Sequence, residues 1–139
     1  MAPRVAAPQI PVSWGELIDR ITILEIKSEK LSAEAALTNV RDELVLLRTI
    51  ADPVLATQPA VTRTKSHLRA INERLWNVED RLREKESVRD FGDEFIELAR
   101  SVYRNNDERA VLKRKINEAL PCGLVEEKSY AGLNAQALS

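Results

Sequence analysis

Two stretches of mostly apolar residues, each repeating in alternating steps of four and three, constrain the fold of this chain more than any other feature. The first repeat occupies Thr64, Leu68, Ile71, Leu75, Val78 and Leu82. The second occupies Phe91, Phe95, Leu98, Val102, Asn105, Arg109, Leu112 and Ile116. Because this spacing keeps the repeated side chains on one helix face, each stretch predicts a long helix with a coiled-coil seam. The two helices are expected to turn back on each other near Asp90.

The composition favours an all-α protein with one domain. The chain has 139 residues, of which 44% are hydrophobic and 31% are charged, and it contains only 4 Gly and 6 Pro. Strands and tight turns would require more Gly and Pro, and a chain of this length can bury a sizeable core. We therefore expect a four-helix bundle of two antiparallel helical hairpins, the second of which is a long coiled-coil hairpin.

The chain is expected to have three parts. Residues 1–12 contain three prolines and no periodicity, and they predict a disordered arm. Residues 13–121 are expected to form the helical domain, which opens with a Ser13 and Glu16 capping box. Residues 122–139 are expected to form a C-terminal tail. The predicted helices cover residues 14–31, 33–51, 60–89 and 91–120.

The segment of residues 52–59 is expected to be the longest internal loop and to separate the two hairpins. Pro53 and Pro59 each disfavour a helical conformation at the residue before them. Residues 32–36 are expected to be a short connection or the first turn of the second helix. The first and second helices are therefore expected to be antiparallel neighbours.

Charge and residue content exclude several classes of function. The formal net charge is -1, so we expect no duplex nucleic acid partner, because such binding depends on neutralising phosphates. The single Cys122 and the single His67 cannot build a disulfide or a Cys/His metal site, and we expect no metal and no cofactor. No apolar run approaches the roughly twenty residues of a membrane span, and residues 1–12 lack the apolar core of a signal peptide. We expect a cytoplasmic protein.

The first helix is predicted to be apolar on two sides. Trp14 belongs to its main seam. Because each residue of a helix is rotated by about 100° from the one before it, Ile23 and Ile26 point away from that seam. One interpretation places this helix at the centre of the bundle, in contact with two neighbours. The other makes Ile23 and Ile26 an exposed apolar strip for dimerisation or for a partner helix. All three residues are candidate interaction residues.

A polar layer interrupts the seam of the long hairpin. If the chain turns near Asp90, Asn72 lies opposite Arg109, and Trp76 lies opposite Asn105. As a structural feature, the layer would fix the register of the hairpin, and replacing Asn105 and Arg109 by Leu would then be expected to stabilise the fold. As a functional feature, it would form a pocket for a small anionic or sugar-like ligand. The candidate ligand-binding residues are Asn72, Trp76, Arg100, Tyr103, Asn106 and Arg109.

The sequence contains no complete catalytic constellation, and we assign no catalytic residue. Glu94 and Glu97 supply only half of the Glu-x-x-Glu and Glu-x-x-Asp pair with which helical nucleotide pyrophosphatases hold magnesium. Residues 18–21 are similar to the Ile-Asp-x-Ile fragment of helical chorismate-mutase-like enzymes, but the Arg expected later in that helix is absent. The chain has no Gly-rich phosphate loop. The sequence therefore favours a protein that is not an enzyme.

Four segments distributed over most of the chain carry a resemblance. They are residues 13–25 (SWGELIDRITILE), 72–76 (NERLW), 98–103 (LARSVY) and 126–130 (EEKSY). They resemble a family of small all-helical bacterial proteins of uncharacterised function. The resemblance implies an accessory role beside glycosyltransferases and tetratricopeptide proteins of surface-sugar pathways. It also suggests that Tyr130 docks against the bundle as an interaction residue, the alternative being an exposed, frayed end.

These observations favour a non-catalytic interaction or scaffold protein that self-associates as a homodimer or higher oligomer. The long hairpin is expected to extend past the shorter one, and a second copy would cover its seam together with the strip of Ile23 and Ile26. A different protein partner is also compatible with this surface. The alternative function is a ligand-binding or enzymatic helical protein that acts on a phosphorylated or sugar-nucleotide compound through the polar layer.

Overall fold

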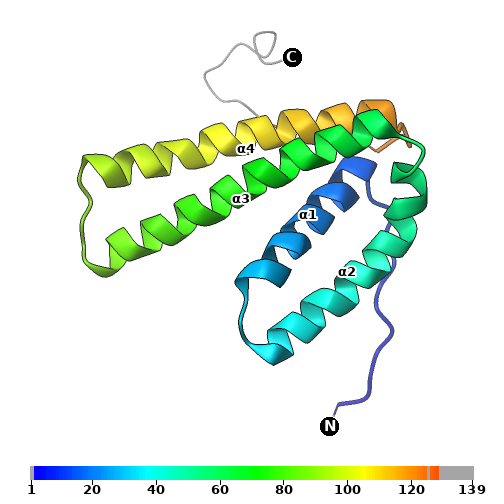
Figure 1. Cartoon of the computed structure of the whole chain (residues 1–139), viewed down its shortest axis with the longest axis horizontal. Helices are drawn as coiled ribbons and strands as arrows, with labels where there is room; N and C mark the ends of the chain where they lie inside the picture. The colour runs from blue at the N-terminus through cyan, green and yellow to red at the C-terminus, as the bar shows by residue number, and fades with distance from the viewer. Residues whose placement is uncertain (1, 125, 129–139) are drawn as a thin grey trace.

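The described residues form four helices and no strand. The computed structural model describes residues 2–124 and 126–128. Its helices are α1 (Trp14–Lys30), α2 (Glu34–Leu55), α3 (Pro59–Ser87) and α4 (Asp93–Ala119). Figure 1 shows α1 with α2, and α3 with α4, as two antiparallel pairs. The all-α class and the four-helix bundle predicted from the sequence are confirmed.

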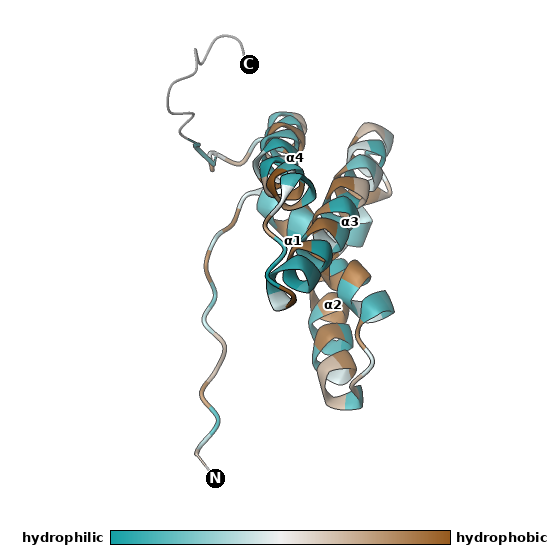
Figure 2. Ribbon diagram, turned by 90° about the vertical axis from the view of Figure 1, so that its left-hand side faces the viewer, coloured by the Kyte–Doolittle hydropathy of each residue, from teal (hydrophilic) through white to brown (hydrophobic). Residues whose placement is uncertain are grey.

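Helix α1 lies at the centre of the bundle. It contacts α2, α3 and α4, whereas α2 and α4 do not touch and lie on opposite sides of the molecule (Figure 2). Its side chains enter two core clusters, one built with α2 around Ile21 and the other built with α3 and α4 around Ile18. Ser13 caps its start by accepting a hydrogen bond from the backbone amide of Glu16.

The central position of α1 explains its two apolar sides. Ile26 is only 1% exposed and Ile23 is half-buried, so the two residues do not form an exposed strip. The second side of α1 is apolar because it packs against the α3–α4 hairpin. The interpretation of α1 as the central helix is the correct one.

The prediction that residues 52–59 form a loop is wrong. Helix α2 continues through Pro53 to Leu55, and the link to α3 is residues 56–58. Pro53 lacks the N–H that would bond the carbonyl of the preceding turn, and its ring crowds that carbonyl, so it disfavours the helix here. Ala51 is fully buried and Leu55 packs against both core clusters, and we attribute the extension of α2 to this packing. Pro59 occupies the first turn of α3, where proline is well tolerated.

The α3–α4 hairpin extends well beyond α1 and α2 (Figure 1). We call residues 76–104 the projecting segment, and the structure describes all of them. None of these residues is fully buried. Its apolar seam, made of Val78, Leu82, Phe95, Leu98 and Val102, is half-buried between only two helices. The core of the molecule therefore lies at one end of the hairpin.

The turn at the far end of the hairpin differs from the prediction by two residues. Helix α4 begins at Asp93, and Phe91 lies in the turn, half-exposed, with its ring edge-on to Phe95. Lys85 closes the turn by contacting Asp90 at 3.0 Å and Glu94 at 2.8 Å. These contacts tie the end of α3 to the start of α4.

Replacing Lys85 by Met is expected to raise the pKa of both carboxyl groups at the turn. Hydrogen bonds from Lys85 lower the pKa of Asp90 and of Glu94 below their ordinary values. A lowered pKa stabilises the fold at neutral pH, and this contribution is lost as the pH falls through the pKa of the folded state. Carboxyl carbon NMR titration of Lys85→Met measures both values. Arg83→Met is the control, because its weaker ion pairs lie outside the turn, and unchanged pKa values in Lys85→Met would contradict the prediction.

The remaining described residues lie outside the helices. Residues 2–12 have no helix or strand and are exposed. Figure 1 shows this segment running away from the bundle. In the described part of the chain, no helix is both long and apolar enough to cross a membrane.

Candidate functional site

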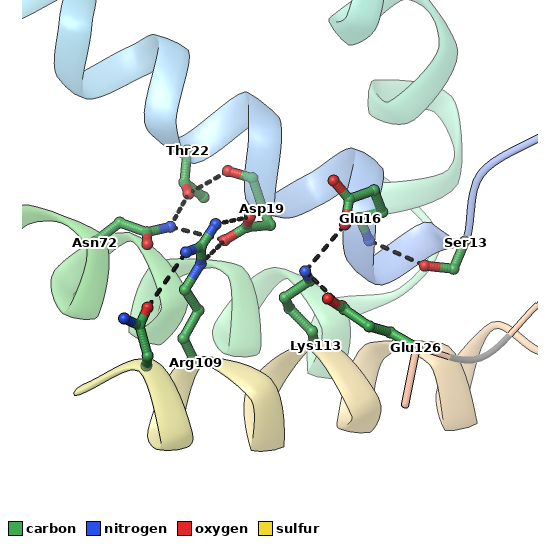
Figure 3. Close-up of polar contacts among 9 residues, drawn as sticks. Ser13, Glu16, Asp19, Thr22, Asn72, Arg109, Lys113 and Glu126 are labelled. Carbon is green, nitrogen blue, oxygen red and sulfur yellow. Dashed lines mark hydrogen bonds and ion pairs between the residues drawn. The ribbon is translucent and has the colours of Figure 1, made fainter. Parts of the chain in front are cut away.

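A buried carboxylate on α1 organises the polar side chains between α1, α3 and α4. Asp19 is 2% exposed and lies one turn into α1. Arg109 of α4 donates from Nε to Asp19 Oδ1 at 2.8 Å and from Nη2 to Asp19 Oδ2 at 2.5 Å (Figure 3). This two-point geometry is the strongest arrangement available between a guanidinium and a carboxylate. It ties the N-terminal half of α1 to the middle of α4.

Asn72 of α3 and Thr22 of α1 complete the hydrogen bonds around Asp19. Asn72 Nδ2 donates to Asp19 Oδ1 at 2.9 Å and to Thr22 Oγ1 at 2.8 Å. The Thr22 hydroxyl donates to the backbone carbonyl of Asp19 at 2.7 Å. We call Asp19, Thr22, Asn72, Asn106 and Arg109 the polar network. The hydrogen bond to Asp19 raises the pKa of Arg109, which therefore remains a cation at every physiological pH.

A second ionic cluster lies one turn further along α4. The Lys113 side chain is 8% exposed, and its Nζ contacts Glu16 Oε2 at 3.0 Å and Glu126 Oε2 at 2.5 Å (Figure 3). Burial acts to lower the pKa of Lys113, but the hydrogen bonds to the two glutamates outweigh this effect and the pKa is raised. Glu126 comes from the segment after α4, so this cluster joins three parts of the chain.

The structure brings together four of the six candidate ligand-binding residues. Asn72 and Arg109 meet through Asp19, and Arg109 Nη1 donates to Asn106 Oδ1 at 3.4 Å. Trp76 lines a small cavity beside them. Arg100 and Tyr103 do not join this group. They are exposed on the outward face of α4, where hydrogen bonding to Arg100 lowers the pKa of Tyr103.

Asn105 contributes to a separate contact in the hairpin. It is buried, accepts a hydrogen bond from Arg74 Nη1 at 3.1 Å and donates to the backbone carbonyl of Ser101 at 2.8 Å. Among the candidate interaction residues, Trp14 is half-buried against the core cluster around Ile18. Tyr130 lies outside the described residues.

Sequence reasoning missed Asp19 and Thr22 as members of the network. The signal that could have identified them is the second side of α1, because Asp19, Thr22, Ile23 and Ile26 follow the i, i+3, i+4, i+7 spacing of one helix face. A carboxylate within a face that also holds two isoleucines requires a buried cation as a partner. Arg109, a charged residue in the seam of the long hairpin, is that partner.

The small cavity beside the network has a volume of about 220 Å³. Its lining includes Ile23, Trp76, Glu79 and Arg109. This volume is below the roughly 300 Å³ at which ligand pockets usually begin, and Arg109 already donates to Asp19 and Asn106. Within the described residues, no group of three or more His, Cys, Asp or Glu side chains could hold a metal ion. The geometry of the polar network is that of a structural junction.

Comparison with known protein families gives one match. Residues 9–136 match the model of the "Family of unknown function (DUF6165)". The match includes all four helices and the segment that carries Glu126. No curated protein and no solved structure matches the chain.

Proposed function

The chain belongs to the family of unknown function DUF6165, and from its own surfaces we propose that it is a non-catalytic helical scaffold that self-associates through the projecting segment. In this proposal two copies pair their α3–α4 hairpins side by side and form a second four-helix bundle. The molecule then has two kinds of core. One is within each chain around α1, and the other lies between the two projecting segments.

One observation carries this proposal, namely the uncovered state of the projecting segment. Trp76, Leu82 and Leu98 are only half-buried there, and Ile96 and Tyr103 are more than half exposed. A pair of helices can bury one seam but leaves the flanks of that seam in water. Association with a second hairpin would remove these flanks from water, which is the main driving force for helical assemblies.

The charges on the outer part of α4 support a second copy as the occupant. Asp93 and Glu97 precede the midpoint between Leu98 and Ala99, and Arg100 and Arg104 follow it at the same distances. A two-fold symmetric, antiparallel pairing of α4 with its copy therefore places Asp93 near Arg104 and Glu97 near Arg100 of the other chain. A surface with this arrangement is complementary to itself, as a symmetric dimer requires.

Reversing the charges on one side of this midpoint is expected to weaken the dimer at least tenfold. The full chain should have twice its 15.7 kDa mass in sedimentation velocity at micromolar concentration. Arg100→Glu with Arg104→Glu places acidic groups opposite acidic groups, and so the dissociation constant should rise. Asp93→Arg with Glu97→Arg should also raise the dissociation constant of the dimer. An equimolar mixture of the two variants should restore a dimer, because each reversed surface then faces its complement.

A matched control separates this effect from a change in net charge. Arg41→Glu with Arg63→Glu makes the same charge change at exposed residues of α2 and α3, outside the projecting segment. This variant should dimerise like the unmodified chain. A monomeric mass at all micromolar concentrations would refute the proposed function. A dimer that tolerates both reversals would refute the proposed pairing.

A further inference from the structure

A second cavity lies between the C-terminal half of α4 and the segment of residues 126–128. Its volume is about 980 Å³, which is at the upper end of the usual range for ligand pockets. Its lining includes Arg109, Lys113, Arg114, Lys115 and Asn117 of α4. It lies outside the projecting segment, so its role is independent of self-association.

The cavity wall combines five cationic side chains with four glutamates, Glu16, Glu118, Glu126 and Glu127. Lys113 places a nearly buried ammonium group there, and Arg114 and Lys115 follow it on α4. The first turn of α1 is also close, because Gly15 N donates to Asn117 Oδ1 at 2.7 Å. A helix N-terminus carries a partial positive charge and favours anions. Positive groups therefore line this cavity, and Glu16 and Glu126 compete there for the charge of Lys113.

A buried donor in the cavity wall lacks an acceptor. Asn117 is 6% exposed, and its Nδ2 has no hydrogen-bond partner among the described residues. The orientation of this amide is fixed, because Oδ1 must accept the hydrogen bond from Gly15 N. An unpaired buried N–H group destabilises the fold, because it has lost its hydrogen bonds to water. This donor is shielded from solvent, so an acceptor reaches it only when a neighbouring group moves aside.

Glu126 holds the position that an anion would take. Its carboxylate lies 2.5 Å from Lys113 Nζ but is half-exposed to solvent. The same segment is held to α4 by surface ion pairs, Glu127 with Arg114 at 3.4 Å and Lys128 with Asp107 at 2.7 Å. Exposed ion pairs of this kind contribute little stability each. The Glu126 carboxylate can therefore be exchanged for another anion at a small cost.

We propose that this cavity binds a small phosphate-bearing molecule, whose phosphate displaces Glu126 from Lys113 and accepts a hydrogen bond from Asn117 Nδ2. Phosphate fits better than a carboxylate because its oxygens can accept from several converging donors at once. Displacement of Glu126 leaves Lys113 paired with Glu16 alone, so the ammonium group can donate a hydrogen bond to the phosphate. The adjoining volume accommodates the rest of the molecule.

Calorimetric titration with inorganic phosphate at constant ionic strength tests the proposal. Glu126→Gln should bind phosphate at least threefold more tightly than the unmodified chain, because a competing carboxylate is removed. Lys113→Met should lose binding at least tenfold. Glu86→Gln is the matched control, since it makes the same charge change at an exposed residue near the far end of α3 and should not alter the affinity. Equal phosphate affinities for Glu126→Gln and Glu86→Gln would overturn the proposal.

A measurement on the unmodified chain does not depend on the folding of Lys113→Met. The side-chain amide protons of Asn117 should shift in NMR spectra as phosphate is added, because Nδ2 gains an acceptor. The side-chain amide of Asn39, exposed on α2, should not shift. Signals of Asn117 that stay constant up to millimolar phosphate would also overturn the proposal.

Discussion

Replacing Arg109 by Leu is expected to lower the free energy of unfolding by about 3–5 kcal/mol, which is the usual cost of breaking a buried ion pair from one side. Among the described residues, only the amide of Asn72 would then remain as a side-chain donor to the Asp19 carboxylate in the core. The sequence alone led to the opposite expectation, that Leu at positions 105 and 109 would stabilise the hairpin. The geometry favours a loss of stability instead, because Arg109 neutralises a carboxylate on a different helix.

Urea denaturation monitored by circular dichroism measures this loss, at one fixed protein concentration because self-association would also contribute to stability. Arg20→Leu is the control, since its ion pair with Glu43 is exposed and lies outside the projecting segment, and it should cost less than about 1 kcal/mol. Asp19→Leu combined with Arg109→Leu should recover most of the lost stability, because an apolar pair can replace a buried ion pair. A loss below 1 kcal/mol in Arg109→Leu would show that Asp19 does not depend on this partner.

The contrast between the hairpin and the polar network shows how far the sequence can predict this fold. The seams of α3 and α4 are regular, so periodicity located both helices and their antiparallel turn. Pairing residues across the turn near Asp90 could match Asn72 only with residues of its own hairpin. Its actual partner, Asp19, lies 53 positions earlier on a helix whose packing angle no repeat encodes. The network was therefore recognised as polar, but its centre was not identified.

The bounds of the helices were predictable only where local chemistry decides them. Ser13 ends the N-terminal segment in the structure as in the prediction, because its side chain supplies the cap. Pro53 did not end α2, since the burial of Ala51 and the packing of Leu55 outweigh one missing hydrogen bond. Arg100 and Tyr103 are predicted from the sequence to line the pocket, but they do not join it. The helix turns them outward, about opposite to Asn105.

Gly15 is a residue whose importance lies entirely in the packing of α1 on α4. A Cβ atom at this position would be 2.5 Å from the backbone oxygen of Lys113 and 2.9 Å from Asn117 Oδ1. Neither group can move freely, because one is helix backbone and the other accepts the Gly15 amide. The absence of a side chain at Gly15 therefore sets the close approach that positions Asp19 against Arg109 and Glu16 against Lys113.

Replacing Gly15 by Ala is accordingly expected to destabilise the fold by about 1–3 kcal/mol. Helix propensity alone favours Ala by about 1 kcal/mol, but steric overpacking costs about 1–3 kcal/mol and the loss of the buried hydrogen bond to Asn117 adds about 1 kcal/mol. The control is Gly92→Ala at the start of α4, where a Cβ atom would meet only the movable side chain of Asp90 and the cost should stay below about 1 kcal/mol. Urea denaturation compares the two variants. A Gly15→Ala chain as stable as the unmodified one would mean that α1 and α4 do not approach this closely, and the junction around Asp19 would then lose its geometric basis.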